Sequence, residues 1–257
     1  MHPVPDSPSR QLLNKVPRVS LVFWLIQILS TTVGETGANY LAVPAGLGRL
    51  PTAALMIALL AAALLYQLRQ PRYVPWAYWL TVVLLSVVGT QITDALTDGL
   101  GVSLYASTAG FSIMLYVVFN LWHGSEHTLA IQTIVTRRRE LFYWAAILLT
   151  FALGTAAGNL ATEALGLDFR LGVVTFGALI LVIFGAGKQG VHPLLTFWLA
   201  YILTRPLGAS LGDLLSQSPD YGGVGWGTVN TSMAFLAVIA TLVATSGNRS
   251  AASHKVR

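Results

Sequence analysis

The sequence WLAYILTRPLGASLGD, residues 198–213, decides the fold, because its skeleton occurs at three earlier places in the chain. In each copy a tryptophan precedes a glycine by ten positions, and an Asn or Asp follows that glycine by five positions. Four copies in one register indicate a tandem repeat. The copies are Trp24, Gly34 and Asn39; Trp79, Gly89 and Asp94; Trp144, Gly154 and Asn159; and Trp198, Gly208 and Asp213.

The composition places these repeats in a membrane. Of the 257 residues, 54% are hydrophobic and only 10% are charged, whereas about a quarter of the residues in a soluble domain are charged. The chain has no cysteine, which excludes disulfides, thiolate metal sites and thiol nucleophiles. We therefore predict an all-α integral membrane protein.

Eight apolar segments are long enough to cross a bilayer, which takes about 20 residues. The odd-numbered segments carry the repeated skeleton, and the even-numbered ones are plain apolar connectors. We therefore expect four tandem helical hairpins, as parallel repeats related by an axis along the membrane normal. The segments lie at about 18–41, 50–68, 75–97, 103–122, 140–163, 170–187, 193–215 and 226–246.

The basic residues predict the orientation. Twelve Lys and Arg residues fall on the side of the two termini, whereas only Arg49 and Arg170 fall on the other. The positive-inside rule then predicts a multi-pass protein of the inner (plasma) membrane with both termini in the cytoplasm. The expected parts are a disordered tail at 1–17, repeats at about 18–70, 71–122, 140–188 and 189–246, a basic loop at 123–139 and a tail at 247–257.

The repeated glycines predict close contacts between helices. Each is followed four positions later by Ala38, Thr93, Gly158 or Gly212, and residues four apart share a helix face. Grooves of small residues let membrane helices approach closely. The residues that we assign to helix packing are Gly34, Gly89, Gly154, Gly158, Gly208 and Gly212.

One position further along, polar pairs follow the same spacing. An ionisable group in a span costs about 2.5–3.5 kcal/mol at the bilayer midplane and by default marks an ion or proton path. The alternatives are an outer vestibule, where this cost is smaller, and hydrogen bonds that only join helices. The pairs are Glu35 and Asn39, Thr90 and Asp94, Thr155 and Asn159, and Ala209 and Asp213.

Arg205 is the deepest charge, and Pro206 follows it. A proline inside a helix removes a backbone donor and frees a carbonyl. A buried guanidinium needs a partner, for which we expect Glu35 or Asp94. Arg205 is then an internal ion pair that fixes the helices, an anion site or a gating charge.

Two further patterns each allow more than one interpretation. Trp24, Trp79, Trp144 and Trp198 each follow another aromatic residue near the predicted cytoplasmic ends, which is typical of an interfacial belt or of packing, and also allows a substrate gate. His123, Glu126 and His127 spell H-x-x-E-H, a spacing of some zinc hydrolases. Incidental metal binding and a solvated loop are the alternative interpretations of that match.

The stretches TTVGETGANYL (31–41) and TRPLGASLGD (204–213), with the four Trp-to-Gly repeats, resemble a bacterial family of uncharacterised membrane-anchored proteins. The resemblance covers about 18–246 and implies four tandem repeats of unknown function, each with two transmembrane segments and a tryptophan. The motif in that family usually ends in Asp, whereas Asn39 and Asn159 stand at two of the four positions here.

Three functions remain open at this point. The first is a transporter or exporter of a small cation. The cation is monovalent or divalent, and transport is with or without proton coupling. Glu35, Asp94 and Asp213 are the candidate metal ligands or proton carriers. The second is a structural or interaction protein without transport, and the third is a membrane enzyme that uses His123, Glu126 and His127. We expect the lipid bilayer and a small cation as partners, and we expect no nucleic acid and no cofactor. Of the three functions, we expect that the protein is not an enzyme.

Overall fold

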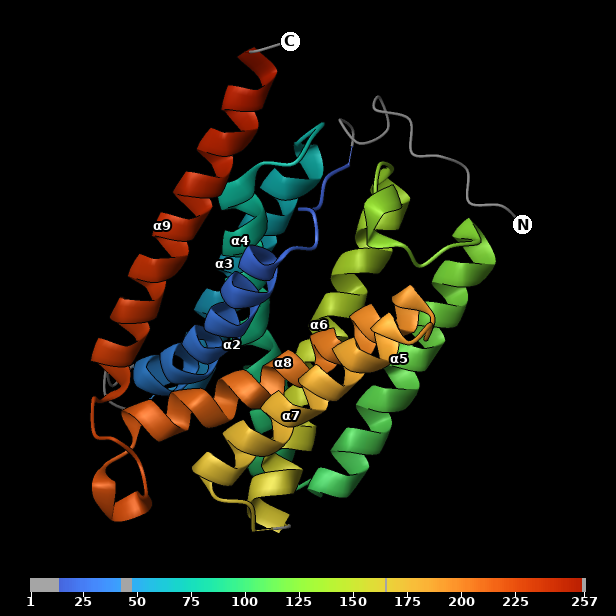
Figure 1. The fold of residues 1–257 in the computed structure, drawn as a ribbon. Coiled ribbons are helices and arrows are strands. Elements are labelled where there is room, and N and C mark those ends of the chain that lie inside the picture. The colour runs from blue at the N-terminus through green and yellow to red at the C-terminus, as the bar shows by residue number, and fades with distance from the viewer. Residues whose placement is uncertain (1–13, 43–47, 165, 256–257) are drawn as a thin grey trace.

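The computed structural model describes residues 14–42, 48–164 and 166–255, with the side chains at 35, 38, 39, 41, 42, 163, 164 and 247–255 left out. The described residues form helices and turns and no strand (Figure 1). The long helices are α2 (Leu21–Ala42), α3 (Arg49–Arg69), α4 (Pro75–Asp94), α5 (Leu104–Glu126), α6 (Arg137–Asn159), α7 (Phe169–Lys188), α8 (Pro193–Ser216) and α9 (Thr228–Lys255). This is the predicted all-α membrane fold, in the predicted order.

Seven of these helices, α3 to α9, are long enough and apolar enough to cross a membrane. The part of α2 with described side chains, Leu21–Gly34, is apolar but shorter than a span. Over its whole length α2 has 22 residues, which is enough to cross a bilayer.

The helix ends follow local sequence signals. Pro75 and Pro193 stand in the first turns of α4 and α8, where a missing backbone N–H costs nothing. The side chains of Ser103, Thr136 and Asp168 cap α5, α6 and α7 by accepting hydrogen bonds from backbone N–H groups of the first turn. These signals set where five of the long helices begin, among them α4, α6 and α8 of the site.

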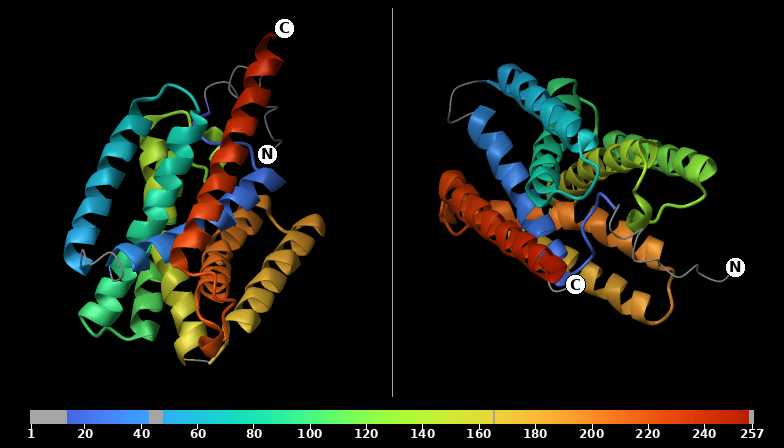
Figure 2. Two further views of the ribbon diagram at one scale, coloured as in Figure 1. Left: turned by 90° about the vertical axis from the view of Figure 1, so that its left-hand side faces the viewer. Right: turned by 90° about the horizontal axis from the view of Figure 1, so that it is seen from above.

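The four helices with the repeated skeleton form a closed ring. α2 packs against α4, α4 against α6, α6 against α8, and α8 returns to α2. The view from above in Figure 2 shows these helices at the centre of the bundle. Among the residues whose side chains are described, the buried ones concentrate on α2, α4, α6 and α8, whereas α3, α5 and α7 bury few.

The connector helices lie outside this ring, each against the ring helix that comes next in the sequence. α3 packs mainly on α4, α5 on α6 and α7 on α8, and α9 completes the circle by packing on α2. The predicted hairpins are therefore sequence repeats but not packing units, because the two helices of each repeat, such as α2 and α3, make few contacts with one another. Each packing unit combines the second helix of one repeat with the first helix of the next.

Three expected boundaries differ in the structure. The connection expected at 123–139 is shorter, because α5 continues to Glu126 and α6 begins at Arg137. Part of the expected first tail is packed, since Lys15 and Val16 are buried, while residues 1–13 lie outside the described part. The expected second tail at 247–257 continues α9 as far as Lys255.

Candidate functional site

The repeated glycines form a cycle of contacts around the ring. Gly34 of α2 lies against Ser86 of α4, Gly89 against Phe151 of α6, Gly154 against Arg205 of α8, and Gly208 against Thr31 of α2. Each contacted residue stands three positions before the repeated glycine of its own helix. The same register at all four interfaces means that the ring helices run parallel, with approximate fourfold symmetry.

These contacts leave no room for a side chain. A Cβ atom on Gly89 would lie 2.7 Å from the Cβ of Phe151, and one on Gly208 would lie 3.1 Å from the carbonyl oxygen of Ile28. Gly158 and Gly212 are also tight, at 3.2 Å from Pro206 Cβ and 3.1 Å from Thr32 Cγ2. At these positions the structure therefore has helices in close contact.

The side chain of Arg205 lies at the centre of this ring and is 0% exposed. Its Nε donates to Thr155 Oγ1 at 2.9 Å, its Nη1 donates to the carbonyl oxygen of Thr31 at 2.5 Å and to Ser86 Oγ at 3.4 Å, and its Nη2 donates to Thr90 Oγ1. α2, α4 and α6 thus each direct oxygen atoms to a positive charge from α8.

The two threonines can only accept hydrogen bonds from the guanidinium. Thr90 Oγ1 donates its own proton to the carbonyl of Ser86 at 3.1 Å, and Thr155 Oγ1 donates to the carbonyl of Phe151 at 3.0 Å. A hydroxyl has one donor and two acceptor lone pairs, so the lone pairs of both oxygens remain for the centre. The centre is therefore lined with oxygen acceptors and suits a cation.

Sequence reasoning identified Thr90, Thr155 and Arg205 but missed Thr31 and Ser86. The acceptors described for Arg205 are neutral, whereas we expected Glu35 or Asp94 as its partner. The side chain of Glu35 lies outside the described residues, so that part stays a prediction. The register was the available signal, because Arg205, Ser86 and Thr31 all stand three positions before a repeated glycine.

The carboxylates and amides of the repeat lie further along the ring helices. Asp94, Asn159 and Asp213 are half-buried and stand four positions after Thr90, Thr155 and Ala209. A π-helical turn begins directly after Asp94 and another directly after Asn159, and such turns often occur at functional sites. The side chain of Asn39 lies outside the described residues.

On the opposite side of Arg205, aromatic residues fill the ring. Trp79, Trp144 and Trp198 are buried and Trp24 is half-buried, so packing, rather than exposure to lipid, describes them best. Tyr78 and Tyr143 join α4 to α6 through a hydrogen bond between their hydroxyl groups. Contacts between aromatic side chains connect this layer around the bundle. Examples are the pairs Phe23 and Trp79, Phe23 and Phe197, Tyr78 and Trp144, and Tyr143 and Trp198.

The H-x-x-E-H residues do not form the helical zinc motif. Glu126 is bound by Arg139, whose Nε lies 2.7 Å from Glu126 Oε2. His127 ends α5 in a left-handed conformation with φ 54°, so it does not share a helical face with His123. Among the residues whose side chains are described, no three His, Asp or Glu groups gather where they could hold a metal.

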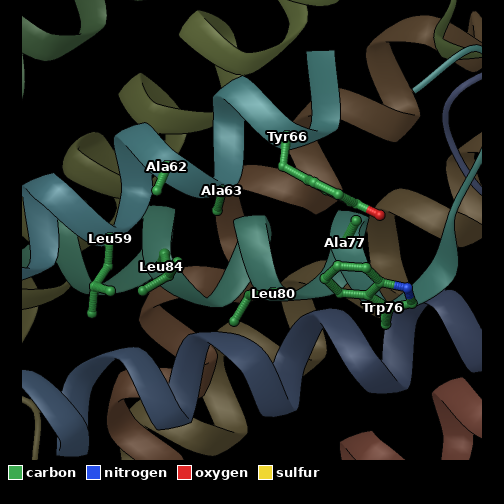
Figure 3. Close-up of a pocket in the computed structure, with 8 residues that line it drawn as sticks. All are labelled: Leu59, Ala62, Ala63, Tyr66, Trp76, Ala77, Leu80 and Leu84. Atoms are coloured by element: carbon green, nitrogen blue, oxygen red, sulfur yellow. The ribbon is translucent and has the colours of Figure 1, made fainter. Parts of the chain in front are cut away.

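A shallow groove lies away from the ring, between α3 and α4 (Figure 3). Its volume is about 300 Å³, and its walls are apolar or aromatic, including Leu59, Leu84, Tyr66 and Trp76. It contains no charged group, so it is separate from the polar centre.

Comparison with known proteins agrees with the repeat. The family described as Repeat of Unknown Function (DUF347) matches residues 22–73, 77–128 and 196–246. These segments correspond to α2–α3, α4–α5 and α8–α9, while the copy that contains Gly154 lies outside the matches but completes the ring. No curated protein matches the chain, and no solved structure does. Because the three matches cover more than half of the sequence, the chain belongs to the DUF347 repeat family.

Proposed function

We propose that this protein transports a small cation across the membrane, through the centre of the ring formed by α2, α4, α6 and α8. The observation that carries the proposal is the set of oxygens around Arg205: Thr31 O, Ser86 Oγ, Thr90 Oγ1 and Thr155 Oγ1. Hydroxyl and carbonyl oxygens are ligands that hard cations prefer. In the described state the guanidinium occupies the position of such a cation.

The local structure of α8 supports the exchange of Arg205 for a mobile ion. Pro206 lies within α8 and has no backbone N–H, so the carbonyl of Ile202 loses its usual partner. Kinks in helices occur at such sites. A bend of α8 at Pro206 would withdraw the guanidinium and expose the oxygens to a solute ion.

The polar residues beyond the centre supply the approach of the ion. Asp94 and Asp213 follow the central layer by about one helical turn, and Asn159 stands at the equivalent position of α6. Carboxylates in an otherwise apolar bundle attract cations, whether monovalent or divalent. We include proton coupling in the proposal, because a carboxyl group on this path can also carry a proton. We also propose that both termini lie in the cytoplasm, as the distribution of the basic residues favours.

A second candidate function is structural, because the hydrogen bonds of Arg205 join α8 to α2, α4 and α6. In this view the centre only holds the helices together, and the protein organises a partner without transport. The same residues would then matter for stability alone.

The deciding experiment is thermal unfolding of the detergent-purified protein against a panel of monovalent and divalent cations and small anions. A ligand that binds the folded state raises the Tm by mass action. We expect one cation to raise the Tm with the logarithm of its concentration, and Asp94→Asn or Asp213→Asn to abolish this rise. Asp220→Asn is the matched control, because Asp220 is exposed in a turn outside the ring and its variant should respond like the wild type.

Flux into proteoliposomes then tests transport of the cation found. Uptake that is lost in Asp94→Asn and kept in Asp220→Asn supports the proposal. If no ion changes the Tm and the variants are simply less stable, the structural function is favoured. An anion whose effect is lost in Arg205→Gln would instead contradict cation transport.

A further inference from the structure

A second buried positive charge lies at the N-terminal end of the ring helices. Lys15, in the segment before α2, is only 8% exposed, and its Nζ lies 2.6 Å from Oε2 of Glu140, which is 1% exposed. The same Nζ donates to the carbonyl oxygen of Leu68 at 3.4 Å. The ammonium group thus lies between the last turn of α3 and the first turn of α6.

The Glu140 carboxylate is held in place by groups other than Lys15. Its Oε1 accepts hydrogen bonds from Gln67 Nε2 at 3.2 Å and from Trp144 Nε1 at 3.5 Å. It stands in the first turn of α6, where the helix dipole stabilises negative charge. The carboxylate therefore keeps its position when the ammonium leaves.

Gln67 provides an additional oxygen beside this carboxylate. Its side chain is fully buried, and its Oε1 has no hydrogen-bond partner among the residues that the structure describes. Buried polar atoms are rarely left without a partner in folded proteins, so such an oxygen calls for an explanation. A turn of the carboxamide that exchanges Nε2 and Oε1 would direct this oxygen to an ion beside Glu140, in place of the hydrogen bond from Nε2 to the carboxylate.

The backbone of the Lys15 segment covers this position. The N–H of Lys15 donates to the carbonyl of Ile134 at 3.0 Å, and Val16 is buried in the hydrophobic core. Figure 1 shows the segment at the same end of the bundle as the last residues of α9. Withdrawal of residues 14–16 would uncover the carboxylate without changing the helices.

We propose that Glu140, Gln67 and the carbonyl of Leu68 form a binding site for a small monovalent cation, which the Lys15 ammonium occupies in the described state. A single carboxylate with neutral oxygens matches one positive charge, and oxygen ligands suit K⁺, Na⁺ or a primary ammonium ion. The role of this site as the inner end of a pathway rests on the proposed function, whereas binding itself requires no transport.

The site and the centre of the ring are alike in design. In each, a positively charged side chain of the protein donates hydrogen bonds to oxygen atoms. This side chain is Arg205 at the centre of the ring and Lys15 at the site beside Glu140. Glu140 and Thr155 are fifteen residues apart on α6, or about 22 Å at 1.5 Å per residue. The aromatic layer with Tyr78 and Tyr143 lies between them. Two sites on either side of a barrier are what a transporter with two gates requires.

The test is the rescue of Lys15→Ala by external cations, measured as the Tm of the full-length protein in detergent. We expect this variant to unfold at a lower temperature than the wild type. Methylammonium, K⁺ or Na⁺ should then raise its Tm with the logarithm of the ion concentration, by about 5 °C or more at about 100 times the Kd. Tetramethylammonium has the same charge but does not fit, so it should have no such effect. Comparing the three effective ions separates a metal-ion site from an ammonium site.

Two variants complete the design. Lys15→Ala combined with Glu140→Gln has no carboxylate, so its Tm should not respond to cations. Lys188→Ala removes an exposed lysine and should respond like the wild type. The proposal is overturned if no small cation rescues Lys15→Ala, or if the double variant responds equally.

If Lys15→Ala cannot be purified without added cation, it is purified in methylammonium and, in parallel, in tetramethylammonium. Folded protein recovered only in methylammonium supports the site, and equal recovery in both contradicts it. Rescue without any cation flux in the wild type would keep the site and remove the proposed transport. Flux without rescue would remove this site and keep the transport.

Discussion

Gly154 of α6 lies directly against the side chain of Arg205 on α8, so that a Cβ atom on this glycine would come within 2.7 Å of the arginine Cγ. The contact explains how a guanidinium is positioned deep in an apolar bundle. The aliphatic part of the Arg205 side chain packs against Gly154 of α6. The guanidinium donates a hydrogen bond to Thr155, one residue after the glycine. Close packing and the polar centre therefore depend on the same contact.

Gly154→Ala should displace Arg205 and destabilise the protein. The added methyl group overpacks the interface, for which a typical cost is about 1–3 kcal/mol. Thermal unfolding in detergent measures the effect. Gly185→Ala on α7 is the control, because nothing lies within 4 Å of a Cβ there. In a helix this exchange stabilises by about 0.5–1 kcal/mol. Equal Tm changes in the two variants would contradict the role of Gly154.

Thr155→Val should weaken the centre while keeping the shape of the side chain. The valine cannot accept the hydrogen bond of Arg205 Nε, and hydrogen bonds to charged groups contribute about 1.5–3 kcal/mol. Thr150→Val is a matched control on the same helix, because Thr150 is equally buried and its described hydrogen bond goes only to the carbonyl of Ile147. We expect a clearly larger loss of Tm for Thr155→Val. A similar loss in both would mean that the bond to Arg205 contributes little.

Much of this fold could be predicted from the sequence, because its strongest signals are local. Apolar length and the prolines at 75 and 193 define helices, and glycines four apart define packing faces. The partners of the connector helices could not be predicted. Apolar residues cover α3 on several sides, with Leu55 and Leu59 exposed in the structure, so periodicity does not indicate which neighbour the helix contacts.

The site was only partly predictable for a different reason. A charge such as Arg205 suggests a carboxylate partner, but one of its acceptors is the backbone carbonyl of Thr31. Every residue has a carbonyl, so the sequence carries no signal for it. Ser86 was recognisable only through the register, which places it at the same point of the repeat as Arg205. Lys15 and Glu140 are 125 residues apart, and no local pattern predicts that they meet.

Tyr78→Phe and Tyr143→Phe should not be additive. Each single variant removes one hydroxyl and leaves the other buried without its partner, which costs about 1–3 kcal/mol. In the double variant both hydroxyls are absent, so the added cost of the second exchange should be small. A double-mutant cycle from unfolding data measures the coupling. Strict additivity would show that the two hydroxyls do not interact.

Tyr73, in the turn between α3 and α4, should contribute to alkaline sensitivity. Burial raises the pKa of its hydroxyl well above the usual value, and a hydrogen bond with Trp79 only partly offsets this. The unfolded chain therefore ionises first, near pH 10. The stability that Tyr73 contributes is present below that pH and is lost as the pH rises above it. Tyr73→Phe should lose less Tm at alkaline pH than the wild type. The exposed Tyr105 supplies the control, because Tyr105→Phe should follow the wild type.

The packing of α9 on α2, which completes the outer circle of connector helices, can be tested with engineered cysteines, because the sequence contains no natural cysteine. Thr36 Oγ1 of α2 lies 2.6 Å from Ser232 Oγ of α9, although the two residues are 196 positions apart. Side-chain atoms this close predict that Thr36→Cys combined with Ser232→Cys forms a disulfide under mild oxidation. Thr36→Cys combined with Thr245→Cys should not, because Thr245 lies thirteen residues, or about 20 Å, further along α9. Mobility on a non-reducing gel distinguishes these outcomes. If α9 instead packed only on α8, its neighbour in the sequence, the first pair would stay reduced, and the outer circle of connector helices would be open.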